Sequence, residues 1–64
     1  GRVNPGGAAE RAGLAPGDVI LLFAGRSVRS AVHLEQLLAG VQPGSHIPVE
    51  YRRNDRSAHT TLSF

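Results

Sequence analysis

The chain has 64 residues, which allows one small domain, because so short a chain buries only about 60% of its unfolded surface. It contains no cysteine, so neither a disulfide framework nor a thiolate metal site can support the small core. Seven arginines against five acidic residues give a formal net charge of +2, with only three aromatic residues beside them. A nucleic-acid surface would need a basic stripe interleaved with stacking residues, so the composition argues against that class.

The first residues, GRVN, are typical of the end of a strand, and Pro5-Gly6-Gly7 then breaks it. The next segment, Ala8 to Ala12, is predicted to form a short helix. Gly13 follows where a helix needs a left-handed residue. The chain begins at Gly1 without Met, inside an extended segment, so we expect residues 1–64 to be a single domain that is a fragment of a longer protein.

A turn and an apolar strand come next. Pro16-Gly17 predicts a turn in which Gly17 takes a positive φ, and Asp18 is expected to cap or brace it. The run DVILLF at residues 18–23 predicts a strand, and its unbroken apolar character predicts burial on both faces. Ala24-Gly25 then gives a tight turn that returns the chain through Gly25 into a short strand at residues 26–28.

A longer helix is predicted from Ala31 to Ala39, with Ser30 as its N-cap and Gly40 closing it. Apolar residues recur along it at spacings of four and three, which indicates one buried stripe; they are Leu34, Leu38 and Val41. His33 and Leu37 are also four residues apart and are expected on a neighbouring face.

The last third predicts a hairpin of residues 46–53 and 57–64, closed by Asn54-Asp55, two residues that tolerate left-handed geometry. Paired positions then sum to 109, which places Val49 opposite Thr60 and Glu50 opposite His59 as one possible ion pair. Pro48 lacks a backbone donor, so it is expected on the edge side of its strand or at a bulge.

No constellation for catalysis is found. The three histidines lack ligand spacing for a metal, and we expect no metal and no cofactor; they are His33, His46 and His59. No serine stands in a Gly-x-Ser-x-Gly elbow, and no glycine loop matches a phosphate-binding pattern. The apolar runs are far shorter than the roughly 20 residues of a spanning helix, and no signal peptide is visible, so we expect no membrane insertion.

The stretch PGGAAERAGLAPGDVILLFAGRSV resembles the signature of bacterial PDZ domains, and PGSHIPVEYRRND resembles the hairpin of the same family. Two positions depart from the pattern: Ala8 stands where the family usually has Pro, and Ala24 where Asn often precedes the turn glycine. The second half is similar to HtrA-type periplasmic serine proteases, above all the stress-sensing member. The resemblance implies an α+β fold: a small, partly open β-barrel or sandwich with two helices.

The resemblance implies a binding module that recognises exposed C-termini of misfolded proteins by strand addition, without catalysis of its own. The implied peptide-binding residues lie on the longer helix and at its end: His33, Leu37, Gly40 and Val41. His33 falls where many PDZ domains bond a ligand hydroxyl, although an exposed histidine at a helix start is an equal alternative. The resemblance also implies that the carboxylate-binding loop and the peptide-pairing strand precede this chain, so the chain alone is expected to bind weakly.

The implied setting is the bacterial periplasm or cell envelope, with the protease domain of a longer chain as a neighbour. A different interpretation is an interaction or scaffold domain of another envelope protein, such as an intramembrane zinc protease, a C-terminal processing protease or a secretion component. The strand edge that the missing N-terminal strand would leave exposed also favours association with a second copy.

Overall fold

The computed structural model describes residues 7–64, so the predicted strand end at residues 1–4 lies outside the described residues. The fold is α+β, as predicted. Its elements in chain order are α1 (Ala8–Arg11), β1 (Val19–Phe23), β2 (Arg26–Ser27), α2 (Ala31–Ala39), β3 (His46–Arg53) and β4 (Arg56–Ser63). Each element predicted within residues 7–64 is present, and its bounds differ from the expectation by no more than about one residue.

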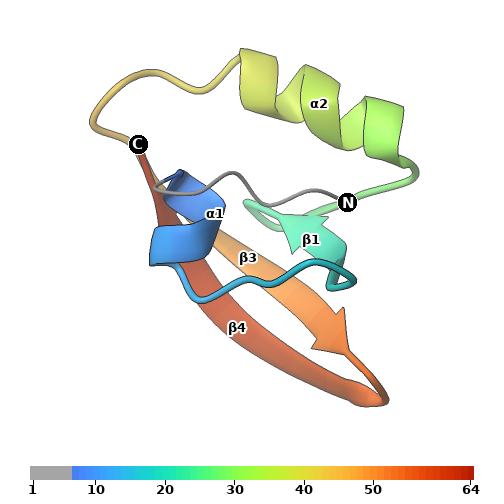
Figure 1. The fold of residues 1–64 in the computed structure, drawn as a ribbon. Coiled ribbons are helices and arrows are strands. Elements are labelled where there is room, and N and C mark those ends of the chain that lie inside the picture. The colour runs from blue at the N-terminus through green and yellow to red at the C-terminus, as the bar shows by residue number, and fades with distance from the viewer. Residues whose placement is uncertain (1–6) are drawn as a thin grey trace.

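The four strands of the described chain form one antiparallel sheet in the order β2-β1-β3-β4. Figure 1 shows the β3–β4 hairpin as the longest feature, with α1 in front of it and α2 at the opposite end of the molecule from the hairpin turn. The described residues therefore form an open sheet with two helices, without closure into a barrel.

The register of the β3–β4 hairpin is confirmed from end to end. Pairing runs from His46 opposite Ser63 to Arg53 opposite Arg56. Asn54 takes the left-handed conformation in the turn, with φ of 56°. Because successive residues of a strand face opposite sides, this register places the buried Val49 on the side of the core.

The core of the described residues is small and comes from four different segments of the chain. Its buried side chains are Leu14, Phe23, Val49 and Leu62. Apolar residues from both helices and three strands pack around them and are only partly buried. Such a thin core leaves little stability in reserve, as expected for a domain of this size.

The prediction that β1 is buried on both faces is wrong. Only Phe23 is buried, and Val19 is 46% exposed. The pairing of β1 with β3 shifts between Ile20 and Leu22, which is a β-bulge. Ile20 is opposite Tyr51 and Phe23 is opposite Val49, so the extra residue brings both onto the core side. The bulge explains why Ile20 and Phe23, three positions apart, are both apolar. Burial of β1 on two faces is not needed to explain it.

The prediction for Pro48 is also wrong, because β3 lies between β1 and β4 and the irregularity is in β1. The Pro48 carbonyl accepts the Ala24 N–H at 2.9 Å. The nitrogen of Pro48 therefore points to the same side, toward β1, one residue beyond the paired Phe23. The missing donor is tolerated because the regular pairing of β1 ends at Phe23, and Ala24, which bonds the Pro48 carbonyl, already belongs to the turn.

Helix α2 is capped at both ends. The Ser30 hydroxyl accepts the His33 N–H at 3.0 Å, and Gly40 is the C-cap. No residue of α2 is fully buried. The expected stripe packs against the core, but Leu37 packs there as well. The helix therefore presents one broad apolar face to the core instead of two separate faces.

Candidate functional site

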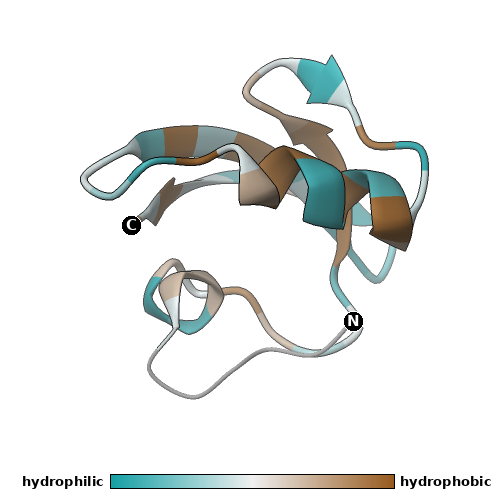
Figure 2. Ribbon diagram, turned by 90° about the horizontal axis from the view of Figure 1, so that it is seen from above, coloured by the Kyte–Doolittle hydropathy of each residue, from teal (hydrophilic) through white to brown (hydrophobic). Residues whose placement is uncertain are grey.

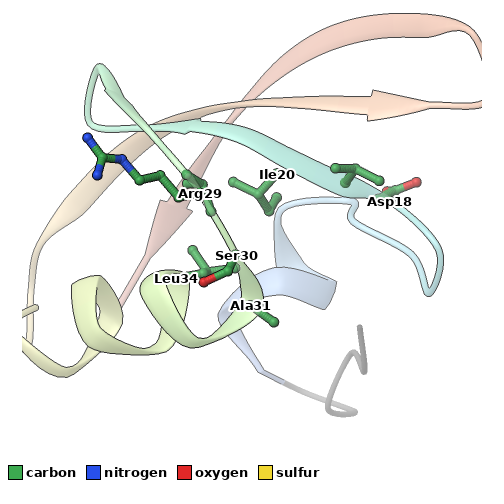
Figure 3. A pocket seen from close by; sticks show the side chains of 8 residues that line it. Asp18, Ile20, Arg29, Ser30, Ala31 and Leu34 are labelled. Atoms are coloured by element: carbon green, nitrogen blue, oxygen red, sulfur yellow. The ribbon is translucent and has the colours of Figure 1, made fainter.

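A groove of about 300 Å³ lies between the start of β1 and the first half of α2. Its lining residues come from β1 and the residue before it, the segment after β2, and the helix start: Asp18, Val19, Ile20, Val28, Arg29, Ser30, Ala31 and Leu34. Figure 3 shows Ile20 and Leu34 extending into the space between strand and helix, whereas Arg29 and Asp18 point outward at opposite ends. The groove thus has an aliphatic centre and polar ends.

The groove is built to accept apolar groups. Ile20, Val28 and Leu34 are partly buried and also contact the core. Figure 2 shows hydrophobic and hydrophilic residues alternating along α2, in front of strands with hydrophobic central parts. Aliphatic walls without a buried charge favour hydrophobic side chains of a ligand or of another segment.

The entrance to α2 carries a reciprocal hydrogen-bond arrangement. While Ser30 accepts the His33 N–H, the His33 ring Nδ1 accepts the Arg29 N–H at 3.1 Å. This resembles a capping box, except that the His33 ring bonds the N–H of Arg29, one residue before the N-cap, instead of that of Ser30. In the neutral ring, the proton is therefore on Nε2, which remains a hydrogen-bond donor.

The four residues expected to bind a peptide do not line this groove. His33 and Leu37 are half-buried, the first in the helix cap and the second against the core. Gly40 is the exposed C-cap, and Val41 is half-buried against the core. Leu37 and Val41 thus both pack against the core, while His33 lies at the other end of the helix.

A second polar arrangement anchors the loop between α1 and β1. Arg53 donates from Nε to Asp18 Oδ1 at 2.9 Å and from Nη2 to Asp18 Oδ2 at 2.6 Å. The same Nη2 donates to the Gly13 carbonyl, and Asp18 Oδ2 accepts the Ala15 N–H. The guanidinium lies over the Tyr51 ring, 5.5 Å from its centroid. One side chain of β3 therefore holds both ends of this loop.

The Asp18 carboxylate is stabilised in its charged form. Hydrogen bonds from the Arg53 side chain, and next from the Ala15 N–H, lower the pKa of Asp18 from 3.8 to about 2. The bond to Asp18 in turn raises the pKa of Arg53. Asp18 thus braces the Gly17 turn as expected, and Gly17 has the expected positive φ of 94°.

The sequence did not reveal the pairing of Asp18 with Arg53, which lie 35 residues apart. Asp18 lies in the Gly-Asp of one stretch that resembles PDZ domains, and Arg53 lies in the Arg-Asn of the other. Their proximity depends on the pairing of β1 with β3, which short-range patterns do not show. The groove residue Leu34 was likewise assigned only to the core.

Within residues 7–64, no group of three or more histidine and acidic side chains is arranged to hold a metal ion. The two strand histidines contact neighbours across the hairpin: His46 with the Ser63 hydroxyl at 2.9 Å, and His59 with Glu50 at 3.3 Å. None of the helices in this part of the chain has the length and apolar character needed to cross a membrane.

Comparison with known proteins identifies the family. The PDZ domain profile matches residues 1–53. The chain belongs to the PDZ domain family. It is 34% identical over 61 residues to a DegP-like periplasmic serine endoprotease of Halomonas elongata, and 34% identical over 55 residues to the serine protease HhoB of Synechocystis. These alignments cover 95% and 86% of this chain.

A solved structure agrees with this assignment. The PDZ fold matches the serine endoprotease from Yersinia pestis with a TM-score of 0.89, 32% identity and 97% coverage of this chain. The chain spans 13% of each curated relative and 23% of the solved one. It is thus a PDZ domain similar to those of HtrA-type serine proteases.

Proposed function

We propose that this PDZ domain is the regulatory peptide-binding module of a periplasmic HtrA-type serine protease. It takes the exposed C-terminus of another protein, such as a misfolded one, as an added strand beside α2. The observation that carries the proposal is the match to the solved serine endoprotease over 97% of the chain. The periplasmic setting rests on the name of the Halomonas relative.

The surroundings of α2 support peptide recognition in chemical terms. A partly buried helix with an aliphatic groove on one flank can select apolar ligand side chains. His33 supplies a polar group at the helix start, since its Nδ1 is occupied by the Arg29 N–H while Nε2–H can bond a hydroxyl. Leu37 and Val41 are only partly buried against the core, so their exposed parts, with Gly40 between them, would contact the ligand toward the far end of the helix.

Calorimetric titration tests this proposal. A peptide with a free terminal carboxylate and its amidated counterpart are compared on this chain and on an N-terminally extended form. We expect weak binding by this chain, tighter binding by the extended form, and a loss of affinity on amidation. Equal, tight binding of both peptides by the short chain would contradict the proposed role of the carboxylate.

Variants of α2 then locate the contact. His33→Gln keeps a side-chain acceptor for a backbone N–H at the helix start, because glutamine at this position can complete a capping box, but it removes the imidazole. It should weaken binding of a peptide with a hydroxyl residue without changing stability. Gln36→Ala, at an exposed position of the same helix, is the matched control. Unchanged affinity in His33→Gln would leave His33 with a capping role only, and a folded chain that binds no peptide would favour a scaffold function.

A further inference from the structure

The outer edge of β4 has an unpaired stretch. β4 is eight residues long and stands at the end of the sheet, with β3 on one side and no other strand of residues 7–64 on the other. The opposite edge is β2, which has only two residues. Long edge strands without proline or a bulge are templates for pairing with another chain, and the β3–β4 register is regular throughout.

The register shows which backbone groups are available. Phe64 N–H donates to the Ser45 carbonyl across the hairpin, so Phe64 and every second residue before it face β3. The intervening residues of β4 direct their backbone groups to the open edge: Ser57, His59, Thr61 and Ser63. The Ser63 carbonyl accepts Arg11 Nη2 at 2.7 Å. The available window is therefore Ser57 to Thr61, bounded by this contact and by the hairpin turn.

This window is symmetric about His59. An antiparallel copy centred there places His59 opposite His59 of the second copy, and Ser57 opposite Thr61 of the second copy. All outward backbone groups of the window are then used, and the occupied Ser63 carbonyl is not needed. We propose that the β4 edge pairs with a second copy of this chain in this register, which continues the sheet across two molecules.

Charge supports a second copy as the occupant. The window reads Ser-Ala-His-Thr-Thr and carries no formal charge when the histidine is neutral, so no like charges stand opposite each other. His59 already has Glu50 as a partner within its own chain, and on the same side of the sheet the next residue of β3 is Arg52, opposite Ser57. A strongly acidic partner would meet Glu50 near the centre of the window.

Five residues per chain bury little surface, so the pairing is weak and depends on concentration. It is independent of the proposed peptide binding, because the window is on β4 whereas the groove is bounded by β1 and α2. Peptide binding could fail while the dimer forms, and the converse also holds.

Nuclear magnetic resonance of the chain at concentrations up to about 1 mM, where interfaces of this size become populated, tests the proposal. The amide signals of Ser57, His59 and Thr61 should move with concentration, while those of Ala58 and Thr60, which bond β3, stay in place. In a mixture of labelled and unlabelled chains, the Cα protons of Ala58 and Thr60 of the second copy should be in contact. A monomer at this concentration, or contacts in another register, would overturn the proposal.

Two variants separate pairing from folding. His59→Lys places a positive group beside Glu50 and also sets two like charges opposite each other at the centre of the dimer, so the dissociation constant should increase about tenfold. His59→Gln leaves the centre neutral and should stay within about twofold of the original chain. Equal dissociation constants for the two variants would show that His59 is not at the centre of the interface.

Discussion

The β3–β4 hairpin and the α2 helix illustrate two ways in which a small domain is held together. The hairpin has a continuous register of eight pairs and contributes two of the buried core residues, Val49 and Leu62. Helix α2 has no buried residue and contacts the core only through partly buried side chains. Stability is therefore concentrated in the hairpin, and the helix that flanks the groove is the less firmly held part.

The largest expected effect tests this comparison directly. Leu62→Ala removes a side chain that is 5% exposed, and we expect a loss of about 3 kcal/mol in the free energy of unfolding. Leu38→Ala, on the partly buried face of α2, should cost about half as much, because less apolar surface is lost. Urea denaturation followed by circular dichroism measures both.

For a domain with so thin a core, Leu62→Ala should leave a large fraction of the chain unfolded in buffer. Hydrogen exchange of the original chain gives an independent check. The β3 and β4 amides that bond each other should exchange by global unfolding, whereas the α2 amides exchange faster, by local opening. Equal protection of hairpin and helix would contradict the division proposed here.

The next effect concerns the contact that joins the loop before β1 to the hairpin. Asp18→Asn removes the charge that pairs with Arg53 and should lower the thermal midpoint by several degrees at neutral pH. Because the pKa of Asp18 falls from 3.8 to about 2 on folding, its stabilisation is complete above about pH 4. It is lost as the pH falls through 2.

The pH dependence identifies the carboxylate. Between pH 4 and pH 2 the original chain should lose more stability than Asp18→Asn, since the variant has no proton to bind at this site. Asp55→Asn, at the exposed hairpin turn, is the matched control and should retain the full pH dependence. If the free energy of unfolding depends on pH in the same way in the original chain and in Asp18→Asn, the charge of Asp18 adds nothing to stability.

A contrast between local and tertiary features explains which parts of the structure could be predicted from the sequence. The hairpin register followed from a two-residue turn and strict alternation, both of which are local. The caps at Ser30 and Gly40 are local as well. The bulge at Leu21, the position of Pro48 and the pairing of Asp18 with Arg53 depend on how β1 meets β3. Those features required the tertiary arrangement.

Most of the candidate site could not be predicted from the sequence, because it also depends on the tertiary arrangement. Helical periodicity separated Leu37 from the stripe of Leu34 and Leu38, but all three pack against the core. A nine-residue helix covering a thin core turns a wide face inward, so spacing alone does not isolate a ligand-facing row. The groove beside Ile20 was missed because it requires β1 and α2 to be placed next to each other.

The smallest expected effect lies at the turn that ends β1, where sequence and backbone disagree. Ala24 has φ of 51° and is followed by Gly25 with φ of 81°. Two successive positive φ values are typical of a type I′ turn, which favours Asn-Gly. A left-handed alanine is strained, and its N–H bond to the Pro48 carbonyl holds it there.

Ala24→Asn should therefore raise the free energy of unfolding by about 0.5–1 kcal/mol, because asparagine tolerates this conformation. Ala24→Val is the matched control at this exposed position, and it should destabilise the chain because a β-branched side chain is least compatible with a positive φ. Both changes are read from urea denaturation midpoints. If both substitutions shift the urea midpoint in the same direction, strain at Ala24 does not limit the stability of the fold. The β1–β2 turn would then be, like α2, a loosely held part of the molecule.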